Sequence, residues 1–287
     1  MVLAEVLHRT GRPLHVAHVN YGLRGADSDA DEALVVAWCA ERAIPCHVHR
    51  ADMSTLQDGV QATARRIRYA HFESVRNDIL AQNNDRVWVA LAHHGDDQAE
   101  TVLLHLMRSA DPMALASMPA IHRDRHLMRP FLSNTREQLA QVAEAWSVPF
   151  REDASNAKPD YLRNRIRHEV MPLLEDLRRG TAGHVAHWAE RFGPLRTVLS
   201  NEVQNAKNRC WTEANSSEGT LDLVAWHGEP LRGEILFQLA ASFGIASKAV
   251  PELAALTEAH VASGAHFSTA SARVERRGKA LVWNRLT

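Results

Sequence analysis

The sequence predicts an α/β protein with a parallel sheet, followed by a smaller second domain. Two observations carry this prediction. Three short runs typical of β-strands, Leu14–Val19, Cys46–Arg50 and Val87–Leu91, alternate with segments of helical period over roughly residues 1–110. Strands separated by helices are typical of a parallel sheet. After residue 110 this alternation fades.

The helical segments begin and end at recognisable signals. Residues 1–9 have apolar residues at helical spacing and end before Gly11-Arg12-Pro13. The stretch Ser28-Asp29-Ala30-Asp31 has the spacing of a capping box, which predicts a helix through Cys39. Further helices are predicted for residues 60–72, for the segment after Gly95 and for residues 135–146, the last capped by Ser133-Asn134.

Near residue 175 the sequence pattern changes to consecutive segments of helical period. We therefore expect a first domain over residues 1–175 and a C-terminal region over residues 176–287 that is mainly helical. Residues 231–243 read as one helix of this region. The last residues alternate around Gly278-Lys279, which predicts a terminal hairpin.

Composition limits the class of protein. The 287 residues are 45% hydrophobic and 23% charged, with a formal net charge of −1, as in a soluble globular protein without a global nucleic-acid-binding charge. Three cysteines without C-x-x-C spacing indicate neither a disulfide framework nor a cysteine metal centre. Without an apolar run of about 20 residues, no membrane helix is expected. A cytoplasmic location is the simplest expectation.

A candidate site lies at Ala92–Thr101, where the third strand ends and a helix begins. Ligands of open α/β sheets bind at this edge. The helix dipole accounts for acidic residues at Asp96 and Asp97. It does not account for His93 or Glu100, which with Asp97 could hold a cationic amine or a metal. A capped structural helix is the alternative interpretation.

Arginines form two further candidate features. Arg65 and Arg68 share a face of the helix at 60–72, and could serve phosphate or simply solvent. The stretch Tyr161–His168 places Arg163, Arg165 and Arg167 within five positions. A solvated helix face and contact with a polyanion explain this run equally well.

Four stretches, in order, resemble the tRNA(Ile)-lysidine synthetases of the PP-loop ATP pyrophosphatase superfamily. The match is specific over residues 1 to about 175 and weak beyond. The matching residues are His18–Gly25; Ala64-Arg65 with Arg68-Tyr69; Ala92–His94 with Asp96–Thr101; and Arg129-Pro130 with Asp153, Ser155-Asn156, Tyr161, Arg163-Asn164, Ile166-Arg167 and Pro172.

The resemblance implies a two-step reaction. ATP activates C2 of the wobble cytidine of tRNA(Ile) and pyrophosphate leaves; the side-chain amine of L-lysine then displaces AMP. The implied roles are recognition and deprotonation of lysine by His93, Asp97 and Glu100, with ATP and Mg²⁺ as cofactors. A homodimer is compatible with the resemblance. The remaining implied residues are Arg65, Arg163, His18 and Asn20 for ATP phosphates; Arg68, Arg129, Arg165 and Arg167 for tRNA; and Asp96 for Mg²⁺.

The chain departs from this family at its beginning. The glycine-rich loop Ser-Gly-Gly-x-Asp-Ser, which cradles the ATP phosphates and normally precedes a helix like that at 1–9, is absent from residues 1–287. The resemblance implies a doubly wound parallel sheet whose first, central strand precedes this loop and lies between the strands at Leu14–Val19 and Arg86–Ala92. Without that strand, a gap of about 10 Å between neighbouring strands is expected. We therefore expect an N-terminally incomplete version of the enzyme. Milder departures are Gln61 and the stretch Arg108–Pro112.

Three alternatives remain. A non-catalytic relative could bind tRNA without ATP chemistry. Another PP-loop enzyme, such as a tRNA thiolase, is disfavoured because the chain lacks paired cysteines for sulfur transfer. A plain α/β protein with incidental histidines and arginines would require four ordered coincidences.

Overall fold

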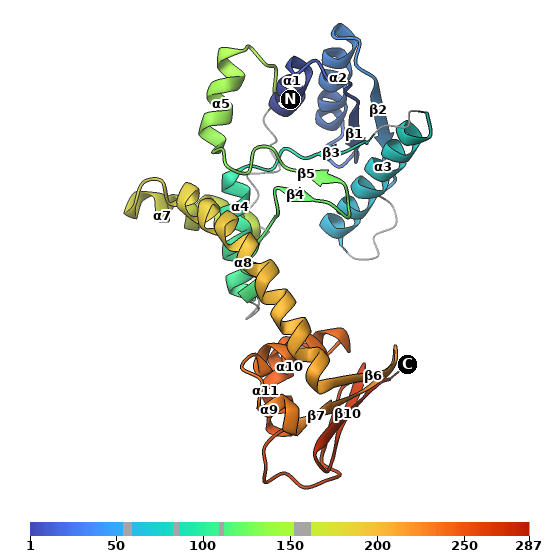
Figure 1. Cartoon of the computed structure of the whole chain (residues 1–287). Coiled ribbons are helices and arrows are strands. Elements are labelled where there is room, and N and C mark those ends of the chain that lie inside the picture. Colours follow the sequence, from blue (N-terminus) through green and yellow to red (C-terminus); the bar gives the residue numbers. More distant parts are fainter. Residues whose placement is uncertain (54–58, 83–85, 109–111, 152–161, 287) are drawn as a thin grey trace. The chain divides into compact units, whose positions relative to one another are not determined.

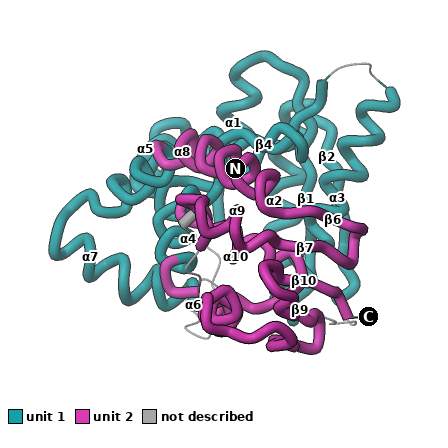
Figure 2. Tube along the Cα trace, turned by 60° about the horizontal axis from the view of Figure 1, so that its bottom comes forward, with its two compact units in different colours: residues 1–105, 116–190 teal, residues 106–115, 191–287 magenta. Residues whose placement is uncertain are grey.

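The chain divides into two compact units, described here from a computed structural model of residues 1–53, 59–82, 86–108, 112–151 and 162–286. Figure 2 colours the N-terminal unit, residues 1–105 and 116–190, and the C-terminal unit, residues 106–115 and 191–287. Helix α8, Thr181–Cys210, is shared between them. The predicted boundary near residue 175 lies before this helix, whereas the division between the two units falls within it, after residue 190.

Parallel strand pairs form the sheet structure of the N-terminal unit (Figure 1). Strand β1, Val16–Asn20, pairs in parallel with β2, Cys46–Arg50. Strand β3, Val89–Ala90, pairs in parallel with β5, Leu127–Met128, which pairs antiparallel with β4, Ile121–His122. The predicted parallel α/β class is confirmed, although β3 is shorter than expected.

Helices follow the strands as predicted, with two corrected caps. Helix α2 begins at Ala26, after Gly25 with φ +51°, and Ser28 lies inside it. The Thr135 side chain, rather than Ser133-Asn134, caps α5 in a capping box with Gln138. The helical elements are α1 Val2–Arg9, α2 Ala26–Glu41, α3 Val60–Gln82, α4 Gly95–Arg108, α5 Arg136–Ala145, α6 Leu162–Arg165 and α7 Met171–Leu177, with a 3₁₀ turn at Pro112–Ala116 and a π-helical turn at Ile166–Val170.

The two strand groups of this unit belong to separate sheets, β1-β2 and β3-β5-β4. A cavity of about 970 Å³ lies between them. Residues of α1, of β1, of α3 and of the segment 86–93 line it. The expected interruption of the sheet is therefore present, at the position where the sequence analysis placed it.

The C-terminal unit contains more strand than predicted. Its antiparallel sheet has the order β6-β7-β10-β9-β8. The hairpin around Gly278-Lys279 is present. Helices cover more of residues 176–287 than strands do, as expected, but the sequence analysis did not predict β6, β7 and β8. The elements are β6 Trp211–Asn215, β7 Glu218–Asp222, α9 Leu223–His227, α10 Arg232–Ser242, a 3₁₀ turn Ser247–Ala249, α11 Val250–Ala255, β8 His266–Ser268, β9 Ala272–Arg277 and β10 Ala280–Arg285.

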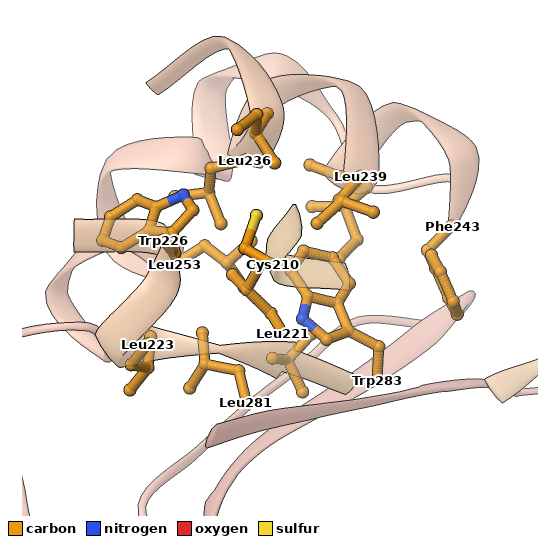
Figure 3. Close-up of a cluster of buried hydrophobic side chains, with 14 of the residues drawn as sticks. Cys210, Leu221, Leu223, Trp226, Leu236, Leu239, Phe243, Leu253, Leu281 and Trp283 are labelled. Carbon is orange, nitrogen blue, oxygen red and sulfur yellow. The ribbon is translucent and has the colours of Figure 1, made fainter. Parts of the chain in front are cut away.

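A single apolar cluster holds this unit together (Figure 3). Leu221 and Leu281 from the sheet and Leu239 from α10 are fully buried. The ring of Trp283 lies 5.4 Å from that of Phe243 and 6.1 Å from that of Trp211, centroid to centroid. Such aromatic contacts add to the area that burial removes from water.

None of the described helices is long and apolar enough to cross a membrane.

Replacing Trp283 by alanine should lower the free energy of unfolding of the C-terminal unit by about 3–5 kcal/mol, because it opens a large cavity in the cluster. Denaturant unfolding followed by circular dichroism measures this change. The exposed Val224, in Val224→Ala, is the control and should have little effect. Equal losses in the two variants would contradict the assignment of Trp283 to the core.

Candidate active site

The candidate site is built on the turn between β3 and α4. The N–H of Gly95, the first residue of α4, donates to the Asn134 carbonyl at 2.7 Å. A Cβ atom at Gly95 would lie 3.0 Å from that same oxygen. The close approach therefore favours glycine at this position and fixes the start of α4 beside the segment before α5.

Asp97 has two functions in this turn. Its Oδ2 accepts a hydrogen bond from the backbone N–H of His94 at 3.1 Å, which caps the beginning of α4. Its Oδ1 faces the guanidinium groups of Arg163 and Arg167, each at 3.1 Å. The capping interpretation and the functional interpretation thus apply to two different oxygens of one carboxylate.

Four charged side chains, Asp97, Glu100, Arg163 and Arg167, form what we call the ion-pair cluster. Glu100 Oε2 accepts from Arg163 Nε at 2.8 Å and from Arg167 Nη2 at 3.0 Å. Glu100 Oε1 accepts from Arg167 Nε at 2.6 Å. Two negative and two positive charges therefore balance one another.

Apolar packing brings the two halves of the cluster together. Ile166 lies between the two arginines in sequence and is 1% exposed, in one buried cluster with Ala99 of α4. Residues three and four apart share a helix face. Packing of Ile166 near Ala99 therefore directs Arg163 and Arg167 toward Asp97 and Glu100.

Burial makes this charge balance necessary. Glu100 is 1% exposed, and an unpaired carboxylate at such a depth would be costly. Burial lowers the pKa of Arg167, but hydrogen bonding to Glu100 outweighs it and the pKa is raised. Arg167 pairs with these carboxylates, and its predicted role in tRNA binding stays a prediction. Arg163 likewise pairs with carboxylates here rather than facing an open phosphate site.

His93 precedes the turn and lines the cavity of the N-terminal unit. Burial lowers its pKa to about 4; Asp97 opposes this shift, and Arg129, Arg163 and Arg68 add to it. Its Nδ1 is buried without a hydrogen-bond partner among the described residues. His93 is therefore neutral at pH 7.

Asp96 does not fit the predicted Mg²⁺ site. Its Oδ2 accepts the backbone N–H of Arg136 at 2.8 Å, at the beginning of α5, and lies 3.4 Å from His94 Nδ1. Although burial opposes the shift, these partners lower the pKa of Asp96. No three His, Cys, Asp or Glu side chains within the described ranges are grouped so that they could hold a metal ion. Asp96 instead connects two helix starts.

The predicted arginines of α3 surround Tyr69. The Arg65 guanidinium lies 4.8 Å from the Tyr69 ring centroid and that of Arg68 lies 5.9 Å from it. Arg65 is exposed and Arg68 lines the cavity. Arg129, by contrast, is 6% exposed and donates to the Pro119 carbonyl at 2.8 Å, and its contact with tRNA stays a prediction.

At the end of β1, Asn20 is a structural residue. Its amide nitrogen donates to Asp29 at 2.9 Å and to Glu32 at 2.8 Å, and its amide oxygen accepts from Gly22 N–H at 2.9 Å. This set of bonds corrects its predicted role toward phosphates. His18 lines the cavity with Arg68, Tyr69 and His93. Burial lowers the pKa of His18 despite the nearby Glu32 and Asp31.

Three other outcomes complete the comparison with the sequence. Arg165 points its charge to Glu169 at 2.9 Å on an exposed helix face, and its contact with tRNA stays a prediction. Asp153, Ser155, Asn156 and Tyr161 lie outside the described residues. The sequence analysis assigned no role to His94, although the pair His93-His94 was a signal for it. In the structure its ring lies 3.4 Å from both Asp96 and Asp97.

Comparison with known proteins agrees with this geometry. The PP-loop domain family matches residues 1–174. The tRNA(Ile)-lysidine synthase of Geobacter sulfurreducens is 38% identical over 200 residues, covering 68% of this chain and 41% of that protein. The tRNA(Ile)-lysidine synthase of Porphyromonas gingivalis W83 is 29% identical over 282 residues, covering 96% of this chain and 59% of that protein. The chain thus spans about half the length of these curated relatives.

A solved structure supports the fold. A U34-tRNA thiolase from Methanococcus maripaludis superimposes with a TM-score of 0.51 and 15% identity, covering 67% of each chain. At this identity the likeness concerns the fold alone. The extent of the family match, together with the parallel strands and the site at the beginning of α4, shows that the chain belongs to the PP-loop domain family.

Proposed function

We propose that this chain carries the catalytic unit of an enzyme that ligates L-lysine to C2 of the wobble cytidine of tRNA(Ile), using ATP. In the first step the cytidine O2 attacks the α-phosphorus of ATP and pyrophosphate leaves. In the second step the lysine side-chain amine attacks C2 and AMP leaves with that oxygen. The observation that carries the proposal is the ion-pair cluster at the beginning of α4.

The cluster offers a site for the lysine cation by exchange. Arg163 is the more exposed of the two arginines, with a side chain 38% exposed against 23% for Arg167. An ammonium group that takes the place of Arg163 beside Asp97 and Glu100 keeps the buried charges balanced. Arg163 is then released toward a phosphate oxygen, for which its planar guanidinium is suited.

Neutral His93 suits the attacking amine. Lysine must lose a proton before its nitrogen can attack, and a neutral imidazole offers one nitrogen lone pair as hydrogen-bond acceptor. The buried Nδ1 without a described partner is available for this contact. We assign His93 to orient the amine and the carboxylates of the cluster to hold its charge.

The ATP side of the proposed site rests on fewer residues. Arg65 and His18 are the candidates for phosphate contact in the described chain, and tRNA contact is assigned to Arg68 and Arg165. Residues 1–287 contain no Ser-Gly-Gly-x-Asp-Ser loop, which this family uses to cradle phosphates. Mg²⁺ is given no step here, since Asp96 is committed to the start of α5.

The rival functions differ in testable ways. A non-catalytic tRNA-binding relative would bind tRNA without tRNA-dependent ATP–pyrophosphate exchange. A thiolase is disfavoured by the cysteines: Cys39 is buried, with a pKa that burial raises to about 12, and Cys210 is buried in the other unit. Neither is a ready thiolate for sulfur transfer.

Lysidine formation tests the proposed function. The 287-residue chain, and the same chain extended before Met1 by a β-strand and a Ser-Gly-Gly-x-Asp-Ser loop, are incubated with tRNA(Ile), ATP and labelled lysine. We expect label in the tRNA and tRNA-dependent ATP–pyrophosphate exchange with the extended chain. Binding of tRNA without exchange by both chains would contradict the proposal and favour the non-catalytic relative.

Glu100→Gln should lower the free energy of unfolding by about 3 kcal/mol, because it removes the buried carboxylate that pairs with the half-buried guanidinium groups of Arg163 and Arg167. It should also abolish lysine transfer by the extended chain. The matched control is Glu169→Gln, whose exposed pair with Arg165 contributes at most about 1 kcal/mol. Thermal unfolding and labelled-lysine transfer measure the two effects. Full activity of Glu100→Gln would refute its assignment.

The pH dependence of stability should report the environment of His93. Its folded pKa lies below the unfolded value, so the unfolded state binds more protons between about pH 4 and pH 6.5. Stability therefore rises with pH across this window. His93→Gln should reduce the slope, whereas replacing the exposed His187 in His187→Gln should leave it unchanged. Unfolding midpoints at several pH values measure both slopes, and an unaltered slope in His93→Gln would contradict this account.

A further inference from the structure

Two histidines of neighbouring strands direct ring nitrogens at each other. His15 comes directly before β1, and His47 is the second residue of β2. Nδ1 of His15 lies 2.9 Å from Nε2 of His47. The ring centroids are 5.3 Å apart and the ring planes differ by 19°. Since the nitrogens are much closer than the centroids, the rings meet through their nitrogen-bearing edges and not through their faces.

The register of the parallel strand pair produces this contact. Ala17 is the β1 residue opposite His47. Side chains two residues apart lie on the same face of a strand, so His15 and His47 share one face of the sheet. Because Ala17 has only a methyl group, space is left on this face for the His47 ring to reach His15.

Helix α3 holds the backbone of β2 from the same face. His71 of α3 donates from Nε2 to the carbonyl of His47 at 3.1 Å, because a carbonyl can only accept. The ring of His71 also packs against that of His49, two residues beyond His47, with the centroids 5.3 Å apart. The strand that carries His47 is therefore fixed by its pairing with β1 and by contacts with α3.

The protonation of this pair suits a metal ligand. A hydrogen bond between two imidazole nitrogens needs one donor and one acceptor, so at least one of the two rings is neutral. Burial lowers the pKa of His15, and the nearby His47 lowers it further. Neutral imidazole nitrogens bind transition metals, whereas protonated ones do not. Near neutral pH the pair therefore offers nitrogen lone pairs at one point.

The separation of the two nitrogens is close to that of two ligands on one metal ion. Zn²⁺ binds histidine nitrogens at about 2.0–2.1 Å in tetrahedral geometry, which places two such nitrogens about 3.3 Å apart. The corresponding distance between His15 and His47 is 2.9 Å. A small separation of the rings, without a change of strand pairing, thus converts the histidine contact into a two-ligand site.

Neighbouring groups leave the site with these two protein ligands. Cys46 precedes His47 and points to the opposite face of β2, where it packs in the cluster of Trp38 and Cys39. Over the ranges that the structure describes, no group of three His, Cys, Asp or Glu side chains could hold a metal ion. Water completes the coordination. Imidazole ligands suit Zn²⁺, Cu²⁺ and Ni²⁺, whereas Mg²⁺ and Ca²⁺ prefer oxygen.

We propose that His15 and His47 form a binding site for one divalent transition-metal ion of the Zn²⁺ class. In the metal-free contact one of the facing nitrogens carries the shared hydrogen. On binding, this hydrogen moves to the far nitrogen of its own ring, and both facing nitrogens donate lone pairs to the metal. The ion connects segments 32 residues apart, and a clip across such a loop stabilises the fold. The inference is independent of the proposed ligase reaction.

Titration with Zn²⁺ alone tests the site on the 287-residue chain with ¹⁵N-labelled histidines. We expect the NMR signals of His15 Nδ1 and His47 Nε2 to shift together to those of metal-bound nitrogens. The hydrogens should then lie on His15 Nε2 and His47 Nδ1. The thermal midpoint should rise with Zn²⁺ concentration, because the ion binds the folded state. Unshifted signals of these two rings at saturating Zn²⁺ would overturn the proposal, and this measurement requires no variant.

Variants separate the pair from the other histidines of the chain. His15→Gln and His47→Gln each remove one ligand and keep a side chain that forms hydrogen bonds. Each should weaken Zn²⁺ binding by at least about tenfold, the lower limit for changes in the shell around a metal. The double variant should lose little more than either single one, since one remaining ring cannot clip two strands.

Two matched controls test the specificity of the pair. His49→Gln removes a neighbouring ring on β2 and should leave Zn²⁺ binding by His15 and His47 unchanged. Mg²⁺ at the same concentration should shift neither ring, because it prefers oxygen ligands. Equal Zn²⁺ affinity of His15→Gln and the unaltered chain would assign the metal to other histidines and overturn the site. A matching response to Mg²⁺ would also refute it, since it would show an effect of ionic strength.

Discussion

Charge balance at the beginning of α4 is the constraint on which the candidate site depends. Glu100 is almost wholly buried, and its carboxylate is tolerated only because Arg163 and Arg167 reach it from the helical segment that begins at Leu162. The segment is held in place by Ile166 in the apolar cluster that contains Ala99. Apolar packing of Ile166 and the ion pairs of Arg163 and Arg167 therefore both hold this segment against α4.

The second constraint is that buried backbone N–H and C=O groups need hydrogen-bond partners. In the N-terminal unit, strands β1 and β3 have a paired strand on one side only. Each of β1 and β3 is paired on one side, while its other side borders the cavity. The polar end of this cavity carries His18, Arg68, Tyr69 and His93. The space that lacks strand pairing thus leads to the residues of the candidate site.

Local sequence signals were reliable where local physics decides. Helix α1, strand β2 and the hairpin between β9 and β10 follow the predictions closely, because apolar period and a glycine turn determine them. The caps of α2 and α5 were misplaced by a few residues, since several Ser, Thr, Asn and Asp residues near each helix start could serve. Strand β6 gave little signal because four of its five residues are exposed, and β8 because it has only three residues.

The sequence by itself determined the parallel α/β class, the resemblance to a PP-loop family and the presence of reactive side chains after the third strand. Only the tertiary structure decided which of those side chains meet. It moved Arg129, Asn20 and Asp96 into structural contacts and brought Arg163 and Arg167 onto Asp97 and Glu100. The reason is physical: spacing along the chain reports neighbours within one helix or strand, whereas burial and pairing of charges depend on segments more than sixty residues apart.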